Sequence, residues 1–316
     1  MIRSGRRGAA TVLASAAVVA VGVLVAPAAT AAPPQASAVA AAPAVPADPA
    51  AWAPAATAPI RPGVLVETAG GGVCTGNFVF TAGDRTFLGL AAHCAGTGEA
   101  TETNGCDSGT VGLGARVAVR AADGTERAGS LAYSSWVTMQ QLGETDPDTC
   151  RFNDFALVEL APGDAVDVNP SIPFFGGPTG IDTDGLPEGE QVLTYGNSPM
   201  RLGVEQLGPK VGVSAGDAGR GASHEVYTVS PGIPGDSGSA FLDADGEAVG
   251  VLSTLNLAPL PVSNGVTDLA TALSYANAHG GLGDVELVNG TAPFSALPAD
   301  VPLEQLTSPA GPPLGG

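Results

Sequence analysis

The stretch Gly235-Asp236-Ser237-Gly238 decides how the rest of the chain is interpreted. It lies between a Pro/Gly-rich loop and a run of residues typical of a strand. A serine hydroxyl is a useful nucleophile only when a base takes its proton and backbone N–H groups stabilise the charge on the attacked carbonyl oxygen. Glycines on both sides allow the backbone angles that direct such N–H groups toward one point. The same residues also suit a surface turn, so the stretch alone leaves both interpretations open.

The chain around this stretch consists of short apolar runs separated by Gly, Asn and Asp, a pattern typical of an all-β barrel or sandwich. Asp-Gly pairs at 123–124 and 245–246 indicate hairpins. The residues over 268–279 place their apolar side chains on one face, which predicts a single helix near the end. We expect strands over 64–68, 77–81, 86–90, 116–120, 128–133, 155–160, 191–195, 224–229, 240–243 and 248–252.

Composition divides the 316 residues into four parts. Residues 1–31 carry three arginines, an apolar run and a small-x-small cleavage motif, and are predicted to be a secretory signal peptide. A membrane anchor is the less favoured alternative. Residues 32–59 are almost entirely Ala and Pro and are predicted to be a disordered or polyproline-like arm or a short pro-segment. A packed domain is expected over 60–295 and a flexible tail over 296–316, in a protein secreted from the cell.

The charge of the chain limits its partners. The formal charge is −19 and falls to −22 without the three arginines of residues 1–31, which argues against nucleic acid and anionic membranes as partners. No stable membrane association is expected after removal of the signal peptide, and no cofactor or metal is predicted. The segment Asp182-Thr183-Asp184-Gly185 is similar to the start of a calcium loop. It lacks the closing glutamate and is interpreted as a solvated turn.

Four cysteines, Cys74, Cys94, Cys106 and Cys150, are present. In an exported chain this number favours two disulfides over metal ligation or free thiols. Three pairings are possible, and the order of the cysteines does not choose among them.

The chain has three histidines that could serve as the base for Ser237. His224 lies in a predicted strand and His279 at a predicted helix end, where a cation is favoured, so both have structural explanations. His93 follows a predicted strand and two alanines that leave room for its ring. Such a pair also needs a buried carboxylate to orient the histidine, and Asp154 opens the apolar run 155–160.

Three segments, Ala-Ala-His-Cys, Asp-Phe-Ala-Leu-Val-Glu-Leu and Gly-Asp-Ser-Gly, together resemble the signature segments of the trypsin-like (chymotrypsin-fold) serine proteases, of the bacterial secreted type. An α/β-hydrolase or a subtilisin would show its catalytic residues in another order. The resemblance covers roughly residues 64–279. It implies two six-stranded antiparallel β-barrels with a C-terminal helix, in an expected monomer that acts on protein or peptide substrates.

The resemblance also implies roles for residues. Ser237 would attack the peptide bond and form an acyl-enzyme, His93 would act as base and then acid, and Asp154 would orient it. The N–H groups of Gly235 and Ser237 would form the oxyanion hole. Ser253 matches the family serine that donates a hydrogen bond to the catalytic aspartate. A non-enzymatic binding protein on the same fold and a secreted esterase are the alternative functions.

The resemblance further implies the disulfide Cys74–Cys94, which leaves Cys106 to pair with Cys150. The sequence at Ile60 reads Ile-Arg-Pro-Gly and lacks the N-terminal start that supplies a partner for the acid before the serine in animal members of the family. The partner of Asp236 is therefore left open.

The resemblance assigns four residues to the specificity pocket. Pro231 occupies the floor position, where enzymes that prefer Arg or Lys carry an aspartate. Leu255 follows Ser253 at a position usually held by glycine and is expected to narrow the entrance, and Gly265 matches the other wall. We therefore predict preference for a small or medium apolar residue on the acyl side of the cut bond.

Overall fold

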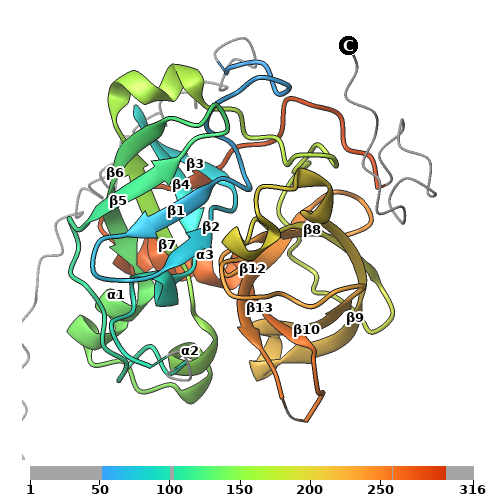
Figure 1. Cartoon of the computed structure of the whole chain (residues 1–316). Coiled ribbons are helices and arrows are strands. Elements are labelled where there is room, and N and C mark those ends of the chain that lie inside the picture. Colours follow the sequence, from blue (N-terminus) through green and yellow to red (C-terminus); the bar gives the residue numbers. More distant parts are fainter. Residues whose placement is uncertain (1–51, 100–102, 258, 297–316) are drawn as a thin grey trace, which may run out of the picture. The chain divides into compact units, whose positions relative to one another are not determined.

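The computed structural model describes residues 52–99, 103–257 and 259–296 (Figure 1). The predicted signal peptide, the predicted arm up to residue 51 and the predicted tail from residue 297 lie outside the described residues. Within the described part of the chain, no helix combines the length and the apolar character needed to cross a membrane.

The first β unit is an antiparallel sheet of eight strands in the order β14-β3-β4-β7-β6-β5-β1-β2. Strand β14 comes from near the end of the described chain and pairs with β3 from near its beginning. The predicted Asp-Gly hairpin at 123–124 joins β5 to β6. The strands are β1 (Leu65–Thr68), β2 (Val73–Thr75), β3 (Val79–Ala82), β4 (Arg85–Leu90), β5 (Arg116–Arg120), β6 (Glu126–Ser134), β7 (Ala156–Leu160) and β14 (Glu286–Leu287).

The second β unit is a closed barrel of six antiparallel strands in the order β10-β13-β12-β11-β8-β9. Closure removes the exposed edges of the sheet. The predicted Asp-Gly hairpin at 245–246 joins β11 to β12. The strands are β8 (Gln191–Tyr195), β9 (Pro209–Ala218), β10 (Ser223–Thr228), β11 (Ala240–Leu242), β12 (Ala248–Leu255) and β13 (Asn264–Asp268).

Helices are few in the described chain. The predicted C-terminal helix is α3 (Leu269–His279), and the side chain of Asp268 caps it by accepting a hydrogen bond from the Thr271 N–H at 2.7 Å. Two helices that the sequence did not predict are α1 (Ser135–Leu142) and α2 (Pro147–Phe152). Short 3₁₀ turns occur at η2 (Ala92–Ala95), η3 (Pro162–Asp167), η4 (Pro199–Arg201), η5 (Glu205–Leu207) and η6 (Gly219–Gly221).

Each β unit has its own buried apolar side chains. In the first unit the rings of Phe80 and Phe155 meet edge to face with centroids 5.4 Å apart. Inside the barrel, Val226, Phe241 and Val266 are fully or almost fully buried. The predicted all-β architecture with a C-terminal helix is therefore confirmed. The first unit has two strands more than predicted, both of them short.

Residues before the predicted domain boundary at Ile60 already pack against the domain. Trp52 packs against the main core, and the N–H of Ala53 donates to the carbonyl of Val168 at 2.9 Å. Asn169 Nδ2 donates to the carbonyl of Ala53 at 2.6 Å. Composition gave no sign of this packing, because backbone groups make most of these contacts.

Candidate active site

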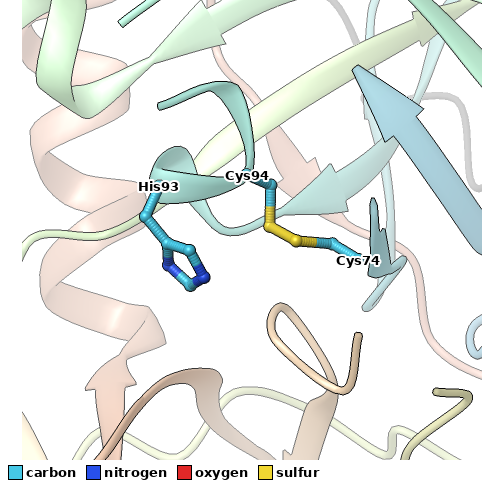
Figure 2. A group of neighbouring side chains, drawn as sticks. All are labelled: Cys74, His93 and Cys94. Carbon is cyan, nitrogen blue, oxygen red and sulfur yellow. A yellow bond between two sulfur atoms is a disulfide. The ribbon is translucent and has the colours of Figure 1, made fainter. Parts of the chain in front are cut away.

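His93 lies in η2, directly after strand β4. Its neighbours Ala91 and Ala92 are small and fully buried, so the turn packs close to the sheet. Cys94 in the same turn forms a disulfide with Cys74 of β2, which holds η2 from the other side. Figure 2 shows that the imidazole leaves η2 in a different direction from the disulfide. The disulfide therefore fixes the backbone at His93 without covering the ring.

Asp154 lies two residues before the start of β7 and faces His93. Its carboxylate is buried and accepts three hydrogen bonds: from the His93 N–H at 2.8 Å, from His93 Nδ1 at 2.6 Å and from Ser253 Oγ at 2.6 Å. Ser253 belongs to β12 of the barrel, whereas His93 and Asp154 belong to the first β unit. These hydrogen bonds thus join the two β units at the candidate site.

The electrostatics of this pair favour the charged carboxylate. Burial raises the pKa of Asp154, but the charge and hydrogen bond of His93 outweigh burial and hold this pKa below its ordinary value. For His93, burial lowers the pKa, and the charge and hydrogen bond of Asp154 raise it above its ordinary value. Because the carboxylate accepts from Nδ1, neutral His93 carries its proton there and presents a lone pair at Nε2.

The peptide bond between Pro234 and Gly235 is held in one orientation. Ser198 Oγ donates to the carbonyl of Pro234 at 2.6 Å. In a trans peptide the N–H points opposite to the carbonyl, so the Gly235 N–H is directed away from Ser198. Gly235 has φ +99°, and a Cβ there would collide with the side chain of Pro199. Glycine is thus required at this position.

The carbonyls that follow are also occupied. The carbonyl of Asp236 accepts from Ser239 N at 2.9 Å, which directs the Ser237 N–H the opposite way. Thr75 of β2 donates its N–H to the carbonyl of Ser237 and its hydroxyl to the carbonyl of Gly235, both at 2.8 Å. Among the described residues, neither the Gly235 N–H nor the Ser237 N–H has an acceptor. The loop therefore presents two preorganised free donors.

Asp236 is fully buried and pairs with two cations. The Arg201 guanidinium donates to both carboxylate oxygens, and Lys210 Nζ donates to Oδ2 at 2.7 Å. Burial raises the pKa of Asp236, but the hydrogen bond from Arg201 and the charge of Lys210 outweigh it, so this pKa lies below its ordinary value. Arg201 and Lys210 are thus the partners of Asp236 that the sequence left open.

A cavity of about 580 Å³ is lined by His93, Asp154 and Ser237. The structure therefore brings the three predicted catalytic side chains to one cavity, with both N–H candidates of the oxyanion hole in the same loop. Ser253, Leu255 and Gly265 also line it, as the sequence led us to expect. Leu255 is 47 % exposed and stands at the cavity wall.

Pro231 is the predicted pocket residue that the structure places elsewhere. It is absent from the described residues that line the cavity, and its carbonyl accepts from Lys210 Nζ at 3.2 Å. The same Lys210 ammonium pairs with Asp236, so Pro231 is linked to the buried ion pair. Gly232 and Ile233, the next residues in the loop, line the cavity instead.

Sequence reasoning missed five residues that shape this site: Thr75, Ser198, Arg201, Lys210 and Glu225. The first four fix the serine loop, and Glu225 lines the cavity. Lys210 is the only lysine of the chain, and this was the one available signal. A lone lysine in an acidic chain is a candidate partner for a buried acid.

Two groups of side chains have the composition of metal ligands. Cys74, His93 and Cys94 form one, but both cysteines are used by the disulfide. Asp182, Asp184 and Glu247 form the other, away from the cavity. Burial and neighbouring acids raise the pKa of Asp182 to about 6. The Asp184 N–H donates to Asp182 at 3.0 Å, which is the contact of the predicted turn.

The other predicted disulfide residues, Cys106 and Cys150, are bonded to each other. Both disulfides thus have the pairing that the resemblance implied. The second one links α2 to the chain before α1. The described part of the chain contains no free cysteine.

No protein-family model matches the chain, and no curated protein matches it. Solved structures that match include Protease A of Thermobifida fusca, at 18 % identity over 73 % of this chain and 99 % of that chain, with a TM-score of 0.46. A Nocardiopsis protease matches at 16 % identity over 72 % and 98 %, with a TM-score of 0.41. A Cellulomonas bogoriensis chymotrypsin matches at 17 % identity over 72 % and 98 %, with a TM-score of 0.42.

These bacterial proteins are of the class that the sequence resemblance led us to expect. At such identities and TM-scores the likeness carries no argument about activity.

Proposed function

We propose that the protein is a secreted serine endopeptidase that cuts peptide bonds through an acyl-enzyme. Ser237 attacks the carbonyl carbon while Nε2 of His93 takes its proton, and His93 then gives that proton to the leaving amine. Asp154 holds the imidazole in the required tautomer and stabilises its protonated form. The N–H groups of Gly235 and Ser237 stabilise the oxyanion. Water then attacks the acyl-enzyme while His93 takes its proton. His93 gives that proton back to Ser237 as the acid product leaves.

The observation that carries the proposal is the 2.6 Å contact between Asp154 and Nδ1 of His93, in a cavity that Ser237 also lines. This contact leaves Nε2 of His93 as the basic atom available to a serine hydroxyl. The occupied carbonyls of the serine loop support the proposal independently, because they leave two N–H groups free for a developing negative charge.

Two features of the chain support the secretion that is part of this proposal. Two disulfides are typical of proteins that fold in an oxidising compartment. Residues 1–31 have the composition of a secretory signal peptide, as the sequence indicates.

For the residue directly before the cut bond, we keep the preference for a small or medium apolar side chain. Pro231 does not support this preference, because it does not line the cavity. Leu255 lines it, and so do the uncharged Gly232 and Ile233. Replacing Leu255 by glycine should widen acceptance toward phenylalanine, measured with peptide nitroanilides that end in Ala, Leu or Phe.

A fluorophosphonate probe tests the proposed function. The mature protein should be labelled on Ser237, and the Ser237→Ala variant should remain unlabelled. Comparing the hydrolysis of matched amide and ester substrates separates an endopeptidase from an esterase. Absence of labelling in folded protein would favour the non-enzymatic binding protein instead.

A further inference from the structure

A second carboxylate lines the cavity of the candidate active site. Glu225 lies on β10, between His224 and Val226, which are both buried inside the barrel. Because side chains alternate along a strand, Glu225 stands on the outer face of the barrel. It is half-buried there, in the same cavity as His93 and Ser237.

The strand register places this carboxylate in line with two other cavity-lining residues, Gly265 and Thr254. Glu225 pairs with Gly265 of β13, and Gly265 pairs with Thr254 of β12. Residues that pair directly across strands share one face of a sheet, and Glu225 is two strand spacings, about 10 Å, from Thr254. Gly265 contributes no side chain between them, and a Cβ at Gly265 would collide with Thr254. The Asn256 side chain links the two: its Nδ2 donates to Glu225 Oε2 at 2.7 Å, and its Oδ1 accepts from Thr254 Oγ1 at 3.1 Å.

Hydrogen bonds hold the Glu225 carboxylate in place through only one of its two oxygens. Asn256 Nδ2 and Ser263 Oγ both donate to Oε2, at 2.7 Å each. Among the described residues, no donor contacts Oε1 and no cation forms an ion pair with Glu225. Arg151 lines the same cavity but is not within ion-pair distance of Glu225.

We propose that Glu225 forms a subsite for a basic side chain, lysine or arginine, of the substrate peptide. The inference rests on the proposed function for its substrate class. Lysine and arginine carry their charge at the end of a three- or four-carbon stem, which lets the charged group extend into the cavity and donate to Oε1. The carboxylate is already oriented by Asn256 and Ser263, so little side-chain entropy is lost when the cation binds.

A lysine scan of short peptide nitroanilides tests the subsite. Each position on the acyl side carries lysine in one peptide and norleucine, an uncharged residue of similar shape, in its partner. At one position the ratio of kcat/KM for lysine over norleucine should be roughly five- to tenfold, and Glu225→Gln should bring this ratio close to one. Glutamine keeps an oxygen to accept from Asn256 and Ser263.

Glu99→Gln is the matched control, because Glu99 is an exposed carboxylate that lines the same cavity and accepts no hydrogen bond among the described residues. This variant should leave the ratio nearly unchanged. An equal fall in both variants would show a general field effect and overturn the subsite, as would a parent ratio near one at every position.

Binding to the Ser237→Ala variant separates this proposal from the proposed function. Fluorescence anisotropy with the lysine and norleucine peptides measures the ratio of their dissociation constants without turnover. Tighter binding of the lysine peptide, lost in the Ser237→Ala, Glu225→Gln double variant, supports the subsite even if fluorophosphonate labelling fails. If the probe labels the parent protein but the Ser237→Ala variant binds both peptides equally, the subsite alone is overturned. Lysine preference at the position next to the cut bond would support the subsite and overturn the apolar preference proposed there.

Discussion

Two histidines of this protein sit against carboxylates, yet only one of them faces a cavity. His93 contacts Asp154 through Nδ1 at 2.6 Å. His224 on β10 contacts Asp217 through Nδ1 at 2.7 Å and Asp268 through Nε2 at 3.2 Å. The His93 side chain is 26 % exposed and that of His224 is 1 % exposed. Both ring nitrogens of His224 are thus occupied, whereas His93 keeps one for a ligand.

The pKa direction does not separate the two sites. Burial lowers the pKa of His224, but the hydrogen bonds of Asp268 and Asp217 raise it above its ordinary value, as Asp154 does for His93. In both sites the carboxylates thus stabilise the protonated histidine relative to a free one. A carboxylate on one nitrogen with the other nitrogen open prepares a base, and carboxylates on both nitrogens make a structural ion pair.

The largest expected difference between the two histidines is in catalysis. His93→Ala should lower kcat by about 10⁴- to 10⁶-fold, as should Ser237→Ala, because the members of a triad act as a unit. His224→Gln should retain most of the kcat of the parent when assayed as folded protein. Steady-state kinetics with one amide substrate measures all three, and circular dichroism checks folding. Near-parental activity in folded Ser237→Ala would end the assignment.

The second difference is in stability. His224→Gln should lower the free energy of unfolding by about 3 kcal/mol, because it leaves the buried Asp268 without its cation. His279→Gln, a change at an exposed histidine at the end of α3, should cost far less. Denaturant unfolding measures both. A loss in His224→Gln no larger than that in His279→Gln would mean that His224 is not a structural ion pair.

The sign of the pH dependence follows from the raised pKa of His224. A folded-state pKa above the unfolded value of about 6.5 gives stabilisation that is fully present below pH 6.5 and lost as the pH rises through the folded value. The stability gap between parent and His224→Gln should therefore be widest below about pH 6 and should narrow on the alkaline side. A gap that widens with pH would contradict this.

The orientation of the Pro234–Gly235 peptide bond should depend on the side chain of Ser198. Ser198→Ala removes the donor that orients the Pro234 carbonyl and should lower kcat by about 10- to 100-fold, less than the loss of an oxyanion donor itself. Ser214 is the matched control: its hydroxyl also donates to a backbone carbonyl and accepts from a backbone N–H, but it lies in β9, outside the cavity lining. If Ser214→Ala lowers kcat as much, the effect of Ser198 is structural and not local.

The pH profile of kcat/KM should identify the base. His93 must be neutral to accept the serine proton, so kcat/KM should rise about tenfold per pH unit and level off above the raised pKa of His93, at a pH higher than about 6.5. Asp154→Asn should move this limb to lower pH, because it removes the charge that raises the pKa. His224→Gln should leave the limb in place. If His224→Gln moved this limb instead, His93 would not be the group whose titration sets kcat/KM.

The smallest expected effect is at Ser253, which donates to Asp154 Oδ2 at 2.6 Å. Ser253→Ala should lower kcat about three- to tenfold, because Asp154 keeps both hydrogen bonds from His93. The rate of fluorophosphonate labelling should fall by the same factor while the midpoint of thermal unfolding changes little. A large loss of thermal stability with an unchanged labelling rate would assign Ser253 a structural role only.

The sequence by itself determined the elements whose signals are local. Alternating apolar runs predicted β5 and β8 at their observed bounds, and the helical pattern predicted α3. By contrast, β13 reads Asn-Gly-Val-Thr-Asp and is fully buried because it pairs with β10 and β12. Helix α1 contains Trp, Val and Thr, which are weak helix formers, and it depends on packing of its buried face. In β13 and in α1, tertiary packing thus outweighs the intrinsic preferences of the residues.

The same division holds for the candidate site. His93, Asp154 and Ser237 could be found from sequence, because each lies in a short segment whose residue types suit the chemistry and whose order is diagnostic. The partners of Asp236 could not, because Arg201 and Lys210 reach it from other segments and only closure of the barrel brings them together. Local sequence patterns indicate only the secondary structure around each residue. Pairings between distant residues, including the position of Glu225 in the cavity, are set by strand register, which only the tertiary structure decides.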